Sequence, residues 1–139
     1  MDRIFQEMTA GIPDHAPLQE ALFAFGSGML RSALSDAQIA LLRVVSMETV
    51  RFPQLGQRFF DLGPGRGIAA LATYLRGQID KGVLRREDPT MMAQHYLGMI
   101  AGPPLIFSLL GVRARPKGNR KQSTRLEKAI EVFERAYLA

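Results

Sequence analysis

The chain has 139 residues, which suits a single domain, and 47 % of them are hydrophobic, enough to form a buried core. It contains no cysteine, which excludes disulfide bonds and thiolate-bound metal sites and is compatible with a reducing cytoplasm. Between Arg113 and Lys128 seven basic residues accompany one acidic residue, so this segment carries +6 and the rest of the chain −1, and the formal net charge of +5 comes from one basic segment.

Apolar residues recur at helical spacing in the first half of the chain. A first helix is expected over 17–33, with Pro17 at its start. A second is expected over 36–51, beginning at Ser35 or Asp36. It ends because Pro53 forces the preceding residue away from helical geometry. A short helix is expected over 54–62.

The glycine-rich segment 63–67 predicts a break, followed by a third long helix over 65–81 whose last turn is capped by Gly82. Asp88 followed by a proline is a strong signal for the start of the next helix, expected over 89–111. Within it, the sequence Gly102-Pro103-Pro104 predicts a kink or an interruption.

A polar, basic loop is expected over 113–122. Thr124 and Glu127 have the spacing of a capping box, which predicts the last helix over 124–138. On its outer face Glu131 and Arg135 are spaced to form an ion pair. No segment alternates with the period of a strand, so the sequence predicts an all-α fold of about six to seven helices in one domain, 1–139.

The basic residues between Arg113 and Lys128 have three interpretations: a solvated connection, contact with DNA phosphates, or contact with anionic lipid. We favour the solvated connection, because a nucleic-acid-binding domain usually spreads its basic residues over a face or along a reading helix. The charge-free run 89–112 is long enough for a membrane span, but its polar residues, glycines and prolines favour a helix buried in the protein or at an oligomer interface.

Few residues have the arrangement that catalysis or metal binding needs. Ser27 lies between two glycines, but its surroundings are not those of a nucleophilic serine and instead suggest close helix packing. His15 and His95 are far apart and lack ligand-spaced partners. The segment 63–67 is read as a turn rather than a phosphate-binding loop, because no strand precedes it. We therefore expect no catalytic residues, no metal and no other cofactor.

Methionines and aromatic residues, which have adaptable or broad apolar side chains, recur along the expected helices. Core packing explains them by default, and an adaptable apolar pocket is the alternative, since methionine can reshape around varied ligands. His95 is either a structural histidine or a polar contact in such a pocket. The candidate ligand-binding residues are Phe25, Met29, Met47, Phe59, Tyr74, His95, Tyr96 and Met99.

Two motifs carry a family resemblance. Glu48-Thr49-Val50-Arg51-Phe52-Pro53-Gln54-Leu55 and Gly82-Val83-Leu84-Arg85-Arg86-Glu87-Asp88-Pro89 resemble elements of the effector-sensing half of TetR-type transcriptional regulators, in particular the AefR-like branch. The resemblance covers nearly the whole chain. It leaves no counterpart for that family's N-terminal helix-turn-helix, and Met1 falls where a linker helix would run. It is also open whether Met1 is the native start.

The resemblance implies a small-molecule-sensing and dimerisation domain, most simply of a repressor, that is not an enzyme. It implies an apolar or amphipathic effector bound between the helices at 17–33, 36–51 and 65–81. It implies that the helices 89–111 and 124–138 pair with their copies in a four-helix homodimer interface. The expected interface residues are Met92, Tyr96, Ile100, Phe107, Leu110, Ile130, Phe133 and Tyr137.

DNA would be contacted only through the helix-turn-helix domain, and we expect no membrane association. The cytoplasm is the expected location, because the chain shows no positive segment followed by an apolar one at its N-terminus. Two alternatives remain open at this point: a stand-alone helical ligand-binding or interaction module without DNA binding, and a small enzyme acting on a lipophilic substrate.

Overall fold

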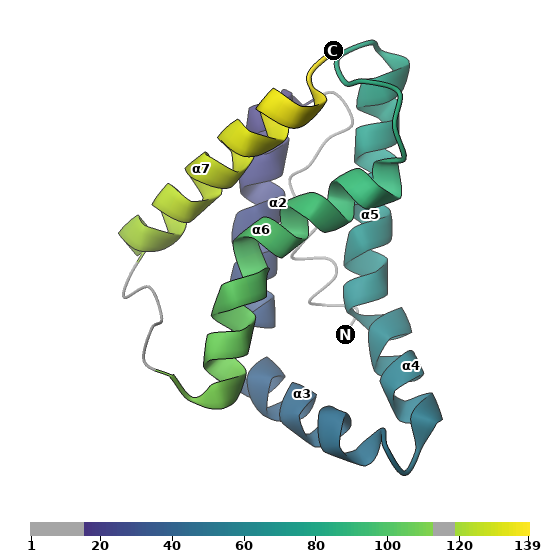
Figure 1. Ribbon diagram of the computed structural model, residues 1–139, viewed down its shortest axis with the longest axis vertical. Helices are drawn as coiled ribbons and strands as arrows, with labels where there is room; N and C mark the ends of the chain where they lie inside the picture. Colours follow the sequence, from purple (N-terminus) through teal and green to yellow (C-terminus); the bar gives the residue numbers. More distant parts are fainter. Residues whose placement is uncertain (1–15, 113–118) are drawn as a thin grey trace.

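The computed structural model describes residues 16–112 and 119–139, and the described chain is all-helical (Figure 1). Its six helices confirm the predicted fold class. They are α2 (Leu18–Ala33), α3 (Asp36–Glu48), α4 (Pro53–Leu62), α5 (Pro64–Asp80), α6 (Pro89–Leu110) and α7 (Asn119–Tyr137). Across the described ranges, no helix combines the length and the apolar character that crossing a membrane requires.

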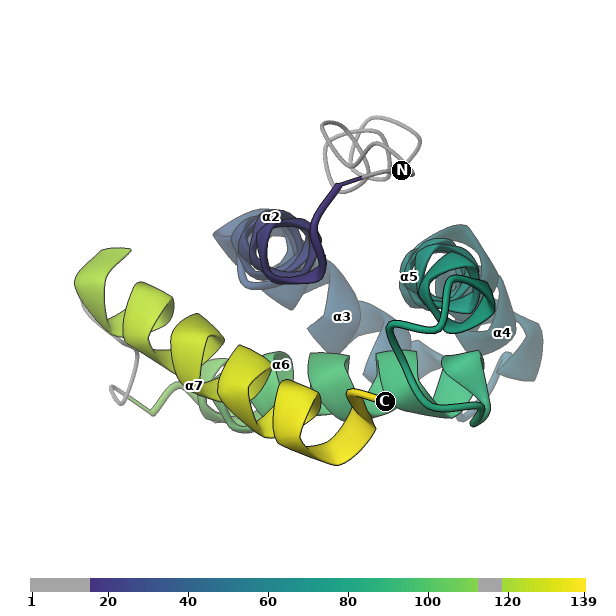
Figure 2. The same cartoon turned by 90° about the horizontal axis from the view of Figure 1, so that it is seen from above.

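The helices form two layers. Seen from above, α2 and α5 lie side by side over a second layer in which α7 crosses α6 (Figure 2). Helix α5 packs on α6, and α2 packs on α7. Helices α3 and α4 lie at the other end of the molecule, where α3 packs against both α4 and α6. The chain therefore has a four-helix body and a smaller end formed by α3 and α4.

Local sequence signals set several helix ends. The hydroxyl of Ser35 accepts a hydrogen bond from the backbone N–H of Gln38 at 3.3 Å, which caps α3. The carboxylate of Asp88 accepts one from the N–H of Thr90 at 2.9 Å, which caps α6. After α5, Gly82 adopts a left-handed φ of 78°, which only glycine takes readily. The predicted caps at Gly82 and Asp88 are confirmed, as is the predicted start of α3 at Ser35 or Asp36.

Three predicted boundaries are wrong. The helix expected over 36–51 ends earlier, at Glu48. The expected break over 63–67 is reduced to Gly63, because Pro64 takes the first helical position of α5, where its fixed φ and missing N–H suit a helix start. The expected capping box does not begin the last helix, because α7 starts at Asn119 and Thr124 lies inside it. The rest of the predicted loop, 113–118, lies outside the described residues.

Helix α6 is bent. It runs unbroken from Pro89 to Leu110 with Pro103 and Pro104 inside it. Figure 1 shows it changing direction partway: its first part crosses in front of α5, and its last part descends toward α3. A proline removes a backbone donor and pushes on the preceding turn, which accounts for the bend. The predicted kink is confirmed, and it carries α6 from the four-helix body to the smaller end.

One apolar cluster joins α2, α5, α6 and α7. Its largest fully buried side chains are Tyr96, Phe25 and Phe133. Gly26 lets the helices approach closely: a Cβ atom there would lie 2.6 Å from the Leu126 side chain and 2.6 Å from the hydroxyl of Tyr96. The small residues flanking Ser27 thus allow tight helix packing, as the sequence suggested.

Candidate functional site

The candidate ligand-binding residues separate into two groups in the structure. Phe25, Met29, Tyr74 and Tyr96 belong to the buried cluster, and Met99 packs against it from a half-buried position. The other three lie elsewhere. Met47 is 72 % exposed on α3, Phe59 is half-buried on α4, and His95 is exposed on α6.

Two tyrosines of the cluster are anchored to the start of α2. The hydroxyl of Tyr96 donates a hydrogen bond to the carbonyl of Leu22 at 2.6 Å, and that of Tyr74 donates one to the carbonyl of Ala16 at 2.8 Å. Burial raises the pKa of both hydroxyls above the ordinary value for tyrosine. Both side chains are therefore neutral donors at physiological pH, and they fix α2 against α5 and α6.

Helix α3 is held to the end of α6 by one long side chain. The guanidinium of Arg43 donates from Nη2 to the carbonyl of Ser108 at 2.8 Å and from Nε to that of Leu109 at 3.2 Å. The carbonyl of Ser108 also accepts from the backbone N–H of Gly111 at 3.2 Å. The last carbonyls of a helix carry partial negative charge, so a cation there is favoured. Sequence reasoning missed Arg43, because its partners lie 65 and 66 residues away.

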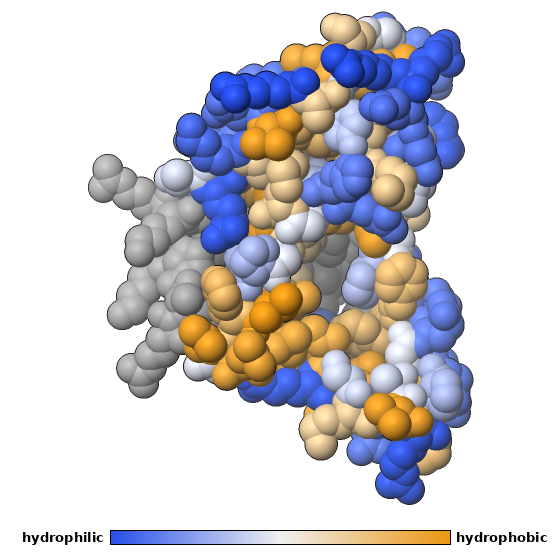
Figure 3. Space-filling model, in the orientation of Figure 1, coloured by the Kyte–Doolittle hydropathy of each residue, from blue (hydrophilic) through white to orange (hydrophobic). Residues whose placement is uncertain are grey.

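The smaller end is lightly packed. On α3 only Ile39 and Val45 are buried, and α4 has no buried residue. Figure 3 shows apolar side chains gathered over the lower part of the molecule, where the ends of α6 and α3 lie. Large apolar side chains exposed at this end are Leu41, Val44, Met47, Val50, Phe52, Leu55, Phe60, Leu62, Ile106, Leu110 and Val112. Few buried contacts make this end the part of the described chain that can open or shift most easily.

Aromatic rings connect the outer side of α6 to the core. His95 stacks with Tyr137 at a centroid distance of 6.1 Å, and its Nδ1 forms a hydrogen bond with the Tyr137 hydroxyl. Tyr137 contacts Phe133, which meets Tyr96 edge to face at 5.9 Å. His95 therefore joins α6 to α7 rather than pointing into the cluster. Desolvation, and then the charge of Glu87, raise the pKa of Tyr137.

The C-terminal residues pair with the loop between α5 and α6. The N–H of Arg85 donates to the carbonyl of Tyr137 at 2.8 Å, and the N–H of Ala139 donates to the carbonyl of Val83 at 3.1 Å. Leu84 and Leu138 form an isolated antiparallel bridge. These bonds fix the end of α7 on the four-helix body and set the register of α6 against α7.

The expected interface residues also fall into two groups. Phe107 and Tyr137 are half-buried, and Leu110 is 72 % exposed. The other five are covered within one chain: Met92, Tyr96, Ile100, Ile130 and Phe133. The accessible side of α6 instead carries Met91, His95, Gly98, Gly102 and Ile106, spaced three or four residues apart. A Cβ atom at Gly98 or Gly102 would meet nothing within 4 Å, so this side of α6 is open.

Charged side chains do not gather into a metal site in the described ranges, which hold no group of three or more histidine, aspartate or glutamate residues placed to bind an ion. The predicted ion pair on α7 is confirmed: Arg135 and Glu131 are 2.7 Å apart, and both are exposed. Most of the basic segment 113–128 lies outside the residues whose side chains are described, so its three interpretations stay predictions.

Known proteins share this arrangement. Residues 20–139 match the family described as AefR-like transcriptional repressor, C-terminal domain. A solved TetR-family regulator from Mesorhizobium loti MAFF303099 superimposes with a TM-score of 0.84 at 19 % identity, covering 99 % of this chain and 67 % of its own. The flavonoid-responsive regulator FrrA gives 0.82 at 24 % identity, covering 98 % of this chain and 70 % of its own.

A TetR-family regulator from Pseudomonas syringae pv. tomato gives a TM-score of 0.73 at 19 % identity, covering 99 % of this chain and 71 % of its own. No curated protein matches the chain. At these identities the solved structures establish the shared fold, while the family match runs over most of the sequence. The chain therefore belongs to the AefR-like C-terminal domains of TetR-type transcriptional regulators, a family of ligand-sensing and dimerisation domains.

Proposed function

We propose that this domain binds a small apolar or amphipathic effector between α2, α3, α5 and α6, and that it works as a homodimer through α6 and α7. The observation that carries the first part is the unequal packing of the two ends. At one end Phe25, Met29, Tyr74 and Tyr96 belong to the closely packed apolar cluster, and Met99 packs against it. At the other end α3 and α4, which carry Met47 and Phe59, are lightly packed and can adapt to a ligand.

Effector binding would be transmitted through α3. Arg43 joins this helix to the last turn of α6, so a displacement of α3 by a ligand must stretch or break its bonds to the carbonyls of Ser108 and Leu109. Because α6 is also the proposed dimer helix, a shift at α3 would reach the relation between the two subunits. This is a coupling between two distinct sites.

The dimer proposal is supported by the open side of α6. Gly98 and Gly102 have no side chain and no neighbour there, which lets a second helix come close, and Ile106 and Leu110 supply apolar area. Val132 on α7 is 51 % exposed and supplies apolar surface on the second helix of the proposed interface. The covered residues Met92, Ile100, Ile130 and Phe133 would hold the two helices in register from behind.

DNA contact belongs, in this proposal, to a separate helix-turn-helix domain. This chain covers 67 to 71 % of the solved regulators, and the remaining part of those proteins is where such a domain would lie. We propose that the regulator is a repressor that acts in the cytoplasm, where its operator is found, and that this domain performs no catalysis.

A ligand screen by thermal unfolding tests effector binding, because a compound that binds the native state raises its melting temperature with concentration. A flavonoid is a natural first probe, since FrrA is described as flavonoid-responsive, with fatty acids and neutral aromatic compounds beside it. Hits are then measured against Met99→Ala, on the inner side of α6, and Met91→Ala, on its outer side.

The proposed site requires that Met99→Ala weaken binding while Met91→Ala leaves it unchanged. Equal effects of the two variants would place the ligand elsewhere. A panel in which no compound stabilises the protein would favour the alternative of an interaction module that binds no small molecule. Turnover of a lipophilic substrate that is lost in His95→Ala would favour the enzyme.

A further inference from the structure

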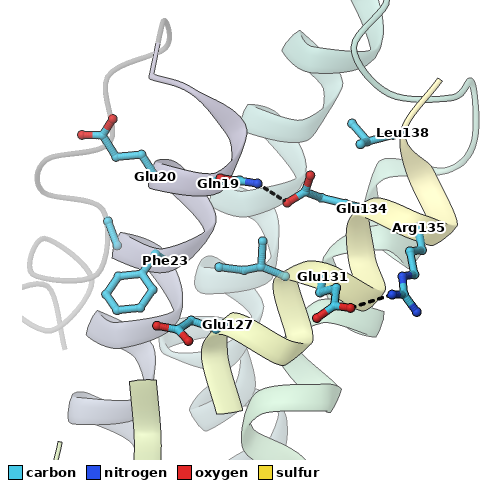
Figure 4. A pocket seen from close by; sticks show the side chains of 10 residues that line it. Gln19, Glu20, Phe23, Glu127, Glu131, Glu134, Arg135 and Leu138 are labelled. Carbon is cyan, nitrogen blue, oxygen red and sulfur yellow. Dashed lines mark hydrogen bonds and ion pairs between the residues drawn. The ribbon is translucent and has the colours of Figure 1, made fainter. Parts of the chain in front are cut away.

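A recess lies on the outside of the four-helix body, away from the proposed effector region. It has a volume of about 910 Å³ and runs between the first turns of α2 and the second half of α7 (Figure 4). Its walls come from Gln19, Glu20, Phe23 and Ala24 on α2, and from Glu127, Ile130, Glu131, Glu134, Arg135 and Leu138 at the C-terminal end. We call this recess the α2–α7 groove.

The groove has an apolar floor. Phe23 and Leu138 are each 38 % exposed in it, and Ala24 and Ile130 complete the floor between them. Exposed aromatic and aliphatic side chains at the base of a concave site are the usual seat for the apolar part of a ligand. The two walls are held at a fixed distance, because the Gln19 amide donates a hydrogen bond across the groove to Glu134 at 2.8 Å.

The rim is acidic, with four carboxylates against the single guanidinium of Arg135. Two of these carboxylates already have partners: Glu134 accepts from Gln19, and Glu131 pairs with Arg135 at 2.7 Å and with Lys128 at 3.4 Å. Glu20 and Glu127 have no bonded partner in the described residues. They come from opposite walls, and Figure 4 shows the ring of Phe23 between them.

A positive charge fits this arrangement. An ammonium group is attracted to the face of an aromatic ring and to nearby carboxylates, and a groove that holds both gives it two kinds of favourable contact. We propose that the α2–α7 groove binds a small amphipathic cation: an ammonium group at Phe23, Glu20 and Glu127, with an apolar tail along Ile130 and Leu138. The proposal does not depend on the effector region or on the ligand bound there.

The groove also lies apart from the proposed dimer surface. The residues that line it come from α2, from α7 and from Leu138, and none belongs to α6, whose open side is the centre of the proposed dimer surface. A cation could therefore bind in each subunit of a dimer. Because α2 also carries Phe25 and Met29, a ligand that braces α2 against α7 would stiffen the wall of the effector region.

The test uses octyltrimethylammonium, with octanol and octanoate as probes of the same chain length and different charge. The chain has no tryptophan, so Phe23→Trp introduces a single fluorescent reporter into the groove and keeps an aromatic face there. Binding is measured with this variant as the parent, and then with Glu20→Gln and Glu127→Gln added singly and together. Glu87→Gln, an exposed site outside the groove, is the matched control.

We expect the ammonium probe to bind at least about tenfold more tightly than octanoate. Each glutamine substitution should raise Kd by up to about fivefold, as is usual for a partly exposed charge pair, and the double substitution by on the order of tenfold. Glu87→Gln should leave Kd unchanged.

Several results would overturn the proposal. They are no binding of the ammonium probe, equal binding of all three probes, or a Kd that the double substitution leaves unchanged. Backbone NMR shifts on ammonium binding that map to α3 and α5 instead of the start of α2 and the end of α7 would also contradict it. The same NMR shifts distinguish the groove proposal from the effector proposal. A variant that loses binding in the groove should still bind the effector near Met99.

Discussion

The close approach of α2 to α6 and α7 depends on Gly26, so Gly26→Ala gives a sharp test of the packing. The new Cβ atom would lie 2.6 Å from the Leu126 Cδ2 atom, 2.6 Å from the Tyr96 hydroxyl and 3.2 Å from the Ile100 Cδ1 atom. All three side chains are fully or almost fully buried and have little room to move. Tyr96 can move only by weakening its 2.6 Å bond to the carbonyl of Leu22.

The opposing effects have comparable sizes. Replacing a helical glycine by alanine stabilises a helix by about 1 kcal/mol. Overpacking a core costs about 1–3 kcal/mol, and a lost hydrogen bond costs about 1 kcal/mol. Gly26→Ala should therefore lower the free energy of unfolding by about 1–3 kcal/mol. Gly77→Ala is the control, because a Cβ atom at Gly77 on α5 meets nothing within 4 Å and should stabilise the protein.

Tyr96→Phe completes a double-mutant cycle. It removes the hydroxyl that the new Cβ atom would strike, so Gly26→Ala should cost about 1–2 kcal/mol less in the Tyr96→Phe protein than in the wild type. The assay is urea unfolding followed by circular dichroism at one fixed protein concentration. If Gly26→Ala stabilises as much as Gly77→Ala, or if the two substitutions are additive, the account of this contact is wrong.

Three further predictions concern α3, its cap and the buried tyrosine. Arg43→Met should destabilise α3 by about 1 kcal/mol and speed hydrogen exchange of its amides, whereas Arg31→Met, at an exposed site, should not. Ser35→Ala should cost about 1 kcal/mol through the lost N-cap, while Ser46→Ala, exposed inside α3, should be neutral or slightly stabilising; equal urea midpoints for the two would contradict the cap. Burial raises the pKa of Tyr96 in the folded protein above its ordinary 10.0, so the native state keeps the proton that the unfolded chain releases. Stability should therefore fall as pH rises above about 10, and the fall should be smaller in Tyr96→Phe when urea midpoints are compared across pH.

The fold followed from the sequence where the signals were local. The caps at Gly82 and Asp88 and the helix start at Ser35 or Asp36 depend on residues within a few positions, and each formed as predicted. The prediction failed where two local signals competed. The glycines over 63–67 predicted a break in the helical structure. Pro64 instead favours the start of a helix, so the break is limited to one residue, Gly63. The capping-box spacing at Thr124 was present inside a helix that had begun earlier.

The candidate sites depended more on contacts between distant residues. Apolar spacing placed Phe25, Tyr74 and Tyr96 on inner helix faces, and they do lie in one cluster. The same spacing could not tell the outer side of α6 from the inner side, because that helix is apolar nearly all round. The bond from Arg43 to α6 joins residues more than sixty positions apart, and Glu20 and Glu127, which line the same groove, are still further apart in the sequence. No local pattern in the sequence reports such contacts.

Dimerisation through the open side of α6 is the claim on which the regulator mechanism depends, and its stoichiometry can be measured directly. Ile106 on α6 and Val44 on α3 are each 56 % exposed, so Ile106→Glu and Val44→Glu make a matched pair that differs only in the helix concerned. A carboxylate buried at a subunit interface without a partner is strongly unfavourable, whereas one on a free surface is not.

Sedimentation equilibrium of the three proteins is the decisive experiment. The account predicts a mass of twice 15.4 kDa for the wild type and for Val44→Glu, and a dimer weakened by at least about tenfold for Ile106→Glu. A wild-type mass that stays at 15.4 kDa at high concentration would contradict the account, as would a dimer that Ile106→Glu leaves unchanged and Val44→Glu disrupts.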